Sequence, residues 1–173
     1  IEIATKGIAY GIFSSAGQAC IAGSRLFIHQ SIYEKFLKRL VEITEGLRVG
    51  HPETPNVHMG SLINQKHLES VHRYVELAKS EGGTVVIGGE AITDGEFAKG
   101  SFYKPTIITG LKNSAQTCQE EIFGPVLVVM SYDNEKDLIE QANDSCFGLA
   151  AGIWTENYRK AWKMARALEV GTV

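Results

Sequence analysis

One cysteine, Cys20, stands in a sequence context that is suited to covalent chemistry. It ends the segment FSSAGQAC (residues 13–20), in which serine, alanine and glycine leave room for a substrate beside the thiol. A cysteine thiolate attacks electrophilic carbonyl carbons. Cys20 is therefore a candidate nucleophile. The alternative interpretation is a small buried apolar side chain, the most common role of a free cysteine.

A second segment that could take part in chemistry is QEEIFGPV (residues 119–126), where two carboxylates precede an aromatic ring, a Gly-Pro corner and an apolar run. A carboxylate at the mouth of a pocket accepts hydrogen bonds from ribose hydroxyls, and a phenylalanine ring packs on a planar ligand. On spacing alone, a solvated charged turn that enters a core strand is the favoured interpretation.

Other candidate groups are weaker. His67 and His72 lie five residues apart, so they diverge around a helix and do not form the i, i+4 pair of a zinc site. We expect no metal site. Cys118 and Cys146 lack the small neighbours of Cys20, and we interpret both as structural thiols. No two glycines are spaced as Gly-x-Gly, so the dinucleotide-binding fingerprint is absent.

The elements that would position these groups alternate between strands and helices. A capping box at Ser31 and Glu34 predicts a helix that stops at Gly50, and a second helix starts near Asn64. Apolar runs predict strands, helical spacing predicts two later helices, and a segment rich in glycine and charge predicts a surface loop. These are strands 84–87, 105–109, 125–132 and 149–154, helices 134–142 and 157–168, and loop 88–103. The alternation is typical of crossover units and a parallel sheet.

Composition bounds the class of protein. The chain has 173 residues, 17 basic and 20 acidic, with a net charge of -3, so no basic excess would attract nucleic acid or an anionic membrane. No apolar stretch is long enough to span a bilayer. Three cysteines, an odd number without a Cys-x-x-Cys pair, indicate a reducing compartment. We therefore expect a cytoplasmic domain that binds neither nucleic acid nor membrane.

Taken together, the two chemical segments resemble the hallmarks of the aldehyde dehydrogenase superfamily. GQAC (17–20) followed by AGSR (22–25) is similar to the active-site segment of that family, and EEIFGPV (120–126) is similar to its second hallmark. Further similar stretches follow in order, namely GSFYKPT (100–106), ANDS (142–145), FGLAA (147–151) and GTV (171–173). The resemblance covers nearly the whole chain.

The resemblance implies a fold and a domain organisation. The expected fold is an α/β open three-layer αβα sandwich with a mostly parallel sheet. Residues 1–173 would form the cysteine-bearing catalytic domain, incomplete at both ends. The nucleotide-binding and oligomerisation parts would lie outside this chain.

The resemblance also implies a reaction, the NAD(P)-dependent oxidation of an aldehyde to a carboxylic acid. Cys20 would carry first a thiohemiacetal and then a thioester, and its backbone N–H would help to hold the oxyanion. Carried over by position, Glu121 would bind the nicotinamide ribose and Phe123 would pack at the nicotinamide end. Ala19 and Ile21, which flank the nucleophile, would line the substrate tunnel.

The general base of the family is a glutamate in a Glu-Leu-Gly-Gly motif upstream of the cysteine, and this sequence contains no such motif. We therefore expect the isolated chain to be inactive. NAD or NADP would be bound mainly by the absent domain, and the substrate would be a small aldehyde. The whole protein would be a homodimer or a homotetramer.

Three alternatives stay open at this point. The first is a CoA-acylating semialdehyde dehydrogenase, in which coenzyme A instead of water accepts the acyl group. The second is a cysteine hydrolase that pairs Cys20 with a histidine, and the third is a non-catalytic module of the same fold.

Overall fold

The computed structural model describes residues 1–173, in which helices and strands alternate along most of the chain. The helices are α1 (Glu2–Phe13), α2 (Tyr33–Glu45), α3 (Gln65–Ser80), α4 (Gln116–Gln119), α5 (Glu135–Asn143) and α6 (Tyr158–Ala167). The strands are β1 (Arg25–His29), β2 (Thr84–Ile87), β3 (Ala91–Ile92), β4 (Phe102–Tyr103), β5 (Thr106–Thr109) and β6 (Val126–Tyr132). Short 3-10 turns cover Gln30–Ile32 and Gly95–Phe97.

A mostly parallel sheet of four strands forms the centre, in the order β1-β6-β5-β2. β6 pairs in parallel with both β1 and β5, whereas β2 joins β5 in the antiparallel sense. All five residues from Val126 to Met130 are buried, as expected for a central strand that is covered on both faces. The prediction of a mostly parallel α/β sheet is confirmed.

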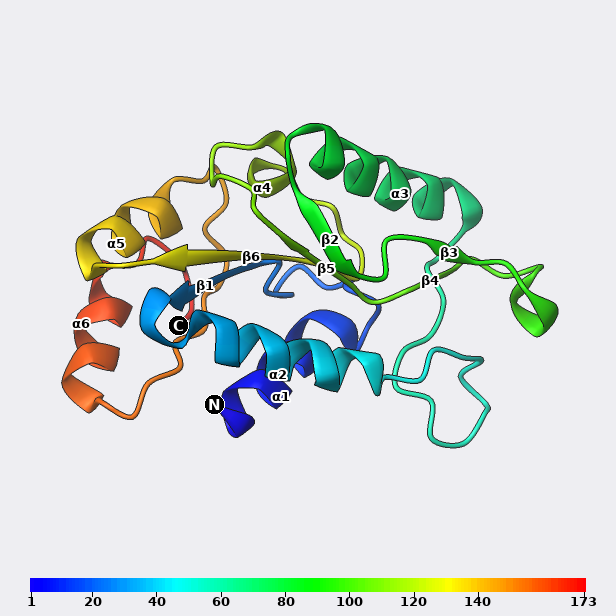
Figure 1. Ribbon diagram of the computed structural model, residues 1–173, viewed down its shortest axis with the longest axis horizontal. Coiled ribbons are helices and arrows are strands. Elements are labelled where there is room, and N and C mark those ends of the chain that lie inside the picture. Colours follow the sequence, from blue (N-terminus) through cyan, green and yellow to red (C-terminus); the bar gives the residue numbers. More distant parts are fainter.

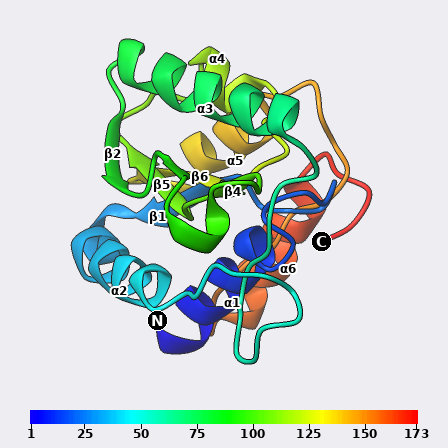
Figure 2. The same ribbon diagram turned by 90° about the vertical axis from the view of Figure 1, so that its right-hand side faces the viewer.

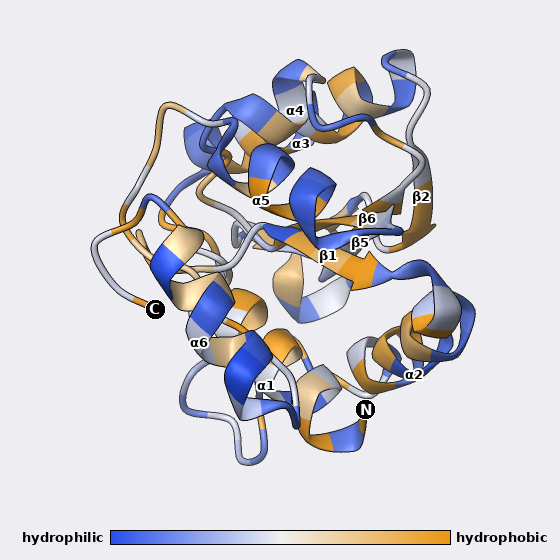
Figure 3. Ribbon diagram, turned by 90° about the vertical axis from the view of Figure 1, so that its left-hand side faces the viewer, coloured by the Kyte–Doolittle hydropathy of each residue, from blue (hydrophilic) through white to orange (hydrophobic).

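Helices cover both faces of this sheet (Figures 1 and 2). α3, α4 and α5 lie on one side, and α1, α2 and α6 lie on the other. A single apolar core of 24 buried residues joins the layers, with the α3 residues Leu68, Val71, Val75 and Ala78 packed toward the sheet side. Hydrophobic segments run through the strands of the sheet, while the helices carry both hydrophobic and hydrophilic residues (Figure 3). No helix is both long and apolar enough to cross a membrane.

The helix boundaries follow the predicted signals, with two exceptions. The helix predicted to stop at Gly50 ends earlier, at Glu45, with Gly46 as its C-cap. The Asn64 side chain accepts a hydrogen bond from His67 N at 2.8 Å and so caps α3, as predicted. The capping box predicted at Ser31 is wrong. Ser31 lies in a 3-10 turn, its hydroxyl pairs with His29 Nδ1 at 2.8 Å, and α2 begins at Tyr33 without a side-chain cap.

The strand predicted at residues 149–154 is not formed. Only an isolated parallel bridge links Ala150 to Thr172, through hydrogen bonds such as that from Ala151 N to Thr172 O at 2.9 Å. A run of apolar residues becomes a strand only beside a partner, and no named strand of the chain pairs with this segment.

The surface loop predicted for residues 88–103 is wrong at two places, because Ala91 and Ile92 form β3 near its start. Phe102 and Tyr103 form β4, which pairs with β3, and both side chains are buried. The ring of Phe102 packs edge-on against Phe97, with 4.9 Å between the ring centroids. The charged residues between the two short strands stay in the loop, which is why the composition of the segment masked this aromatic contact.

Candidate active site

Sheet topology brings the two chemical segments together. The Cys20 segment directly precedes β1, and residues 120–125 directly precede β6. β1 and β6 are parallel neighbours, with Arg25 opposite Val128, so the segments that lead into them meet at the same edge of the sheet. This edge is formed by the amino ends of the strands.

Glycines let the two segments touch through their backbones. Gly17 has a φ of +67°, and a Cβ at this position would overlap the carbonyl group of Gly124. Ala16 also lies in the left-handed region, with a φ of 52°. The turn before Cys20 therefore requires glycine both for its backbone conformation and for its close approach to the Gly124–Pro125 corner.

Gln18 ties the cysteine segment to the loop that precedes α3. Its Oε1 accepts a hydrogen bond from Ile63 N at 2.9 Å, and its Nε2 donates to Ser61 O at 3.3 Å. Both partners are backbone groups more than 40 residues away in sequence, so spacing gave no signal for this contact. The anchor lies two residues before Cys20 and restricts the path of the chain there.

Of the three cysteines, Cys20 combines exposure with a place in the cavity. Its side chain is exposed, and neither its thiol nor its backbone N–H is hydrogen-bonded within the chain. Cys118 is buried, and burial raises the pKa of its thiol to about 11. Cys146 is also exposed, so its interpretation as a structural thiol is not supported by burial.

The carboxylates of Glu120 and Glu121 have different surroundings. Glu120 accepts hydrogen bonds from Tyr74 Oη at 2.7 Å and from Gln116 Nε2 at 2.9 Å, and its bond with Tyr74 raises the pKa of that phenol. Glu121 is exposed on the cavity side and binds no group of the chain. Glu120 therefore has a structural partner, and the Glu121 carboxylate is available to a ligand.

Glu81 holds the short helix that leads into this turn. Its carboxylate accepts hydrogen bonds from Gln116 N at 2.7 Å, Thr117 N at 3.2 Å and Thr117 Oγ1 at 2.6 Å. The two backbone N–H donors belong to the first turn of α4 and lack partners inside the helix. Sequence analysis missed this residue because it follows α3, far from the segment it binds.

A cavity of about 890 Å³ is lined by the residues that the two segments bring to this edge. Ala19, Cys20, Ile21, Glu121 and Phe123 all line it, and Phe123 is 39% exposed. The cavity extends between β1 and residues 148–155, where most of the lining side chains are apolar.

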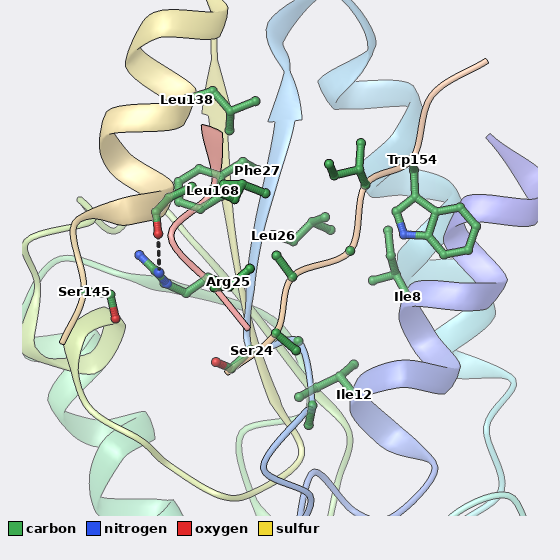
Figure 4. Close-up of a pocket in the computed structure, with 18 of the residues that line it drawn as sticks. Ile8, Ile12, Ser24, Arg25, Leu26, Phe27, Leu138, Ser145, Trp154 and Leu168 are labelled. Atoms are coloured by element: carbon green, nitrogen blue, oxygen red, sulfur yellow. Dashed lines mark hydrogen bonds between the residues drawn. The ribbon is translucent and has the colours of Figure 1, made fainter. Parts of the chain in front are cut away.

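Figure 4 shows the apolar part of this cavity. Leu26 of β1 and Ile8 and Ile12 of α1 lie around it, and the Trp154 ring stands beside Ile8. Arg25 turns away toward the end of α5, where it donates to Ala142 O at 3.1 Å and to Asn113 Oδ1 at 2.7 Å. Burial lowers the pKa of the Arg25 guanidinium, and these acceptors bind its two terminal nitrogens.

The histidines serve other contacts. None is hydrogen-bonded to Cys20; His67 Nε2 lies 2.7 Å from Phe123 O, and His72 Nδ1 lies 3.0 Å from Tyr103 Oη. The thiol–imidazole pair that a cysteine hydrolase requires is therefore not formed. No three histidine, cysteine, aspartate or glutamate side chains gather as a metal site would require.

Comparisons with known proteins place the whole chain in one family. The model of the aldehyde dehydrogenase family matches residues 1–173. A betaine aldehyde dehydrogenase from Mesorhizobium japonicum is 38% identical over 172 residues, which cover 99% of this chain and 35% of that protein.

Solved structures show the same likeness. An NAD+ complex of an aldehyde dehydrogenase from Bacillus cereus is 41% identical, with a TM-score of 0.94. A betaine aldehyde dehydrogenase from Staphylococcus aureus in complex with NAD+ is 35% identical, with a TM-score of 0.97. Each match covers 99% of this chain and 34% of the other, so the chain spans about a third of the length of these relatives. This chain belongs to the aldehyde dehydrogenase family.

Proposed function

We propose that this chain supplies the nucleophile of an NAD(P)-dependent dehydrogenase that oxidises an aldehyde to a carboxylic acid. One observation carries the proposal: three groups line the same cavity. They are the exposed thiol of Cys20, the unpaired carboxylate of Glu121 and the half-exposed ring of Phe123. Membership of the family supports it, as does the NAD+ present in the related structures.

The Cys20 thiolate would add to the aldehyde carbonyl and form a tetrahedral thiohemiacetal whose oxygen carries the negative charge. Loss of a hydride from that carbon leaves a thioester on Cys20. The substrate is thereby oxidised by two electrons, and NAD(P) supplies the hydride acceptor when it is bound. Water then attacks the thioester, releases the acid and returns the thiol.

The residues around Cys20 suit this sequence of steps. The Cys20 backbone N–H has no acceptor within the chain and is free to donate to the oxyanion. The exposed Glu121 carboxylate fits ribose hydroxyls as donors, and the Phe123 ring offers an apolar surface to a planar nicotinamide. Ala19 and Ile21 would contribute apolar contacts to an uncharged part of the substrate.

Other parts of the function would lie outside residues 1–173. A general base, the domain that binds most of the cofactor and the surfaces of a homodimer or homotetramer would come from the rest of the protein. We therefore expect the isolated chain to be catalytically incompetent. Water is the proposed acyl acceptor, and a CoA-acylating reaction is distinguished from it by its product.

The test compares two exposed cysteines in the whole protein. Cys20→Ala should lower aldehyde-dependent NAD(P)H formation by about 10³-fold or more, because it removes the only covalent route. Cys146→Ala is the matched control and should leave the rate unchanged. A panel of small aldehydes that includes betaine aldehyde gives the substrate preference, and product analysis separates free acid from acyl-CoA. Full activity in Cys20→Ala, or turnover by residues 1–173 alone, would contradict the proposal.

A further inference from the structure

His67 is bound to the turn that carries Phe123. His67 Nε2 lies 2.7 Å from Phe123 O, and the two rings meet edge to face with 6.3 Å between their centroids. We propose that His67 is a positioning residue that sets the Phe123 ring for the nicotinamide end of the cofactor. The inference rests on the proposed function, and it concerns a residue that the sequence motifs do not mark.

The backbone of Phe123 needs an external support. Its φ of +56° lies in the left-handed region, which costs free energy for a residue with a Cβ and is uncommon for a bulky one. No backbone N–H of the chain donates to the Phe123 carbonyl, so His67 is its hydrogen-bond partner. The imidazole, with Nε2–H as the donor, therefore stabilises a conformation that the local sequence disfavours.

A second contact from the same helix fixes the next residue. The Cα of Gly124 packs so closely on Val71 that an added Cβ would lie 2.5 Å from Val71 Cγ2. His67 and Val71 are four residues apart, so they lie on the same face of α3. One helix thus holds Phe123 through its carbonyl and Gly124 through its Cα.

His67 is itself held in place. Its backbone N–H donates to the Asn64 side chain that caps α3, and its imidazole is only partly exposed. The hydrogen bond from His67 fixes the backbone carbonyl of Phe123. Because the carbonyl and the ring are attached to the same Cα, this bond also limits the positions that the ring can adopt. Its loss should weaken the cofactor contact of the ring and leave the thiol chemistry largely intact.

The experiment uses the whole protein and measures NAD+ affinity directly by calorimetry, with kcat and KM for NAD+ alongside. His67→Ala and His67→Asn should raise the Kd and the KM for NAD+ by about tenfold and change kcat by less than threefold. His67→Gln should keep the Kd and the KM for NAD+ within about twofold of the wild-type values, because Gln Nε2 reaches nearly the same point as His Nε2. Rescue by Gln but not by Asn distinguishes a placed donor from general packing.

His72→Ala is the matched control, since His72 lies on the same helix and pairs with Tyr103 Oη instead of the turn. It should leave NAD+ affinity unchanged. A double-mutant cycle with Phe123→Ala then asks whether His67 acts through Phe123. In the Phe123→Ala protein, His67→Ala should raise the Kd for NAD+ by less than about twofold.

The outcomes separate the two proposals. An unchanged protein that neither binds NAD+ nor oxidises aldehydes would overturn the proposed function. An active protein in which His67→Ala binds NAD+ normally would overturn the role of His67 alone. A full tenfold effect of His67→Ala in the Phe123→Ala background would also overturn that role, because His67 would then act without the ring.

Discussion

The two walls of the candidate active-site cavity differ in how the chain holds them. Residues 16–25 and 120–126, here called the cysteine wall, are joined by the contact between Gly17 and Gly124 and lead into paired strands. Residues 147–155, here called the flanking wall, form no strand. Both walls line one cavity, but only the first is fixed on several sides by the rest of the chain.

The flanking wall exposes large apolar side chains. Phe147 is 54% exposed, Leu149 50% and Trp154 51%, although each lines the cavity. Its contacts with the rest of the chain include backbone hydrogen bonds to Gly171 and Thr172 and the packing of the Trp154 ring on Gly7 of α1. The comparison teaches that the placement of Cys20 is encoded within this chain, whereas the shape of the opposite side of the cavity is only weakly constrained.

The largest expected difference between the walls comes from adding one methyl group to a glycine of each. Gly17→Ala should lower the free energy of unfolding by about 2–4 kcal/mol, because the residue must keep a positive φ and its Cβ would overlap Gly124. Gly152→Ala should change it by less than about 0.5 kcal/mol, since the nearest atom to its added Cβ is Trp154 Nε1 at 4.0 Å.

Urea unfolding of the two variants measures this difference. The variants carry the same chemical change, so their comparison isolates the surroundings of the glycine. Equal losses of stability would show that the flanking wall is as tightly constrained as the cysteine wall.

A smaller effect is expected from the Glu81 carboxylate, which holds the start of α4 just before residues 120–126 of the cysteine wall. Glu81→Gln should destabilise the fold by about 1–2 kcal/mol, because three donors of Gln116 and Thr117 lose a charged acceptor. Glu169→Gln, on the side of the flanking wall, should have almost no effect, because the Glu169 side chain binds no group of the chain. Thermal unfolding of both variants provides the measurement, and a silent Glu81→Gln would remove α4 from the supports of the site.

Alkaline pH tests the buried thiol behind the cysteine wall. Burial raises the pKa of Cys118 to about 11, above its value in an unfolded chain. Between pH 9 and 11 the thiol therefore ionises in the unfolded state while it stays protonated in the fold. Stability that is complete below pH 9 should fall by about 1–2 kcal/mol across this range.

Unfolding measured against pH in Cys118→Ala tests the assignment. The variant should be less stable at neutral pH because it loses packing, but its decline between pH 9 and 11 should be shallower. Cys146→Ala, which changes an exposed thiol, should keep the slope of the unchanged chain. Identical slopes in all three proteins would argue against Cys118 as the titrating group.

The sequence predicted the parts of the site that are conspicuous locally. Cys20 has small neighbours, and the apolar run after Pro125 indicates a central strand, so both segments and their order were found. The contacts that hold them were not predictable, because Gly17 meets Gly124, and His67 meets Phe123, across long stretches of chain. Periodicity also does not reveal whether an extended segment has a partner, which is why residues 149–154 were wrongly predicted as a strand.

The smallest expected effect concerns the flanking wall itself. Leu149→Thr should change the free energy of unfolding by less than about 0.5 kcal/mol, because half of the side chain already contacts solvent. Leu127→Ala in β6, where the side chain is fully buried, should cost about 2–5 kcal/mol. Urea unfolding of both variants of residues 1–173 measures the two losses in the free energy of unfolding. A loss above about 1 kcal/mol for Leu149→Thr would mean that the flanking wall is packed in solution, and its apolar side chains would then join the cysteine wall as a fixed part of the cavity.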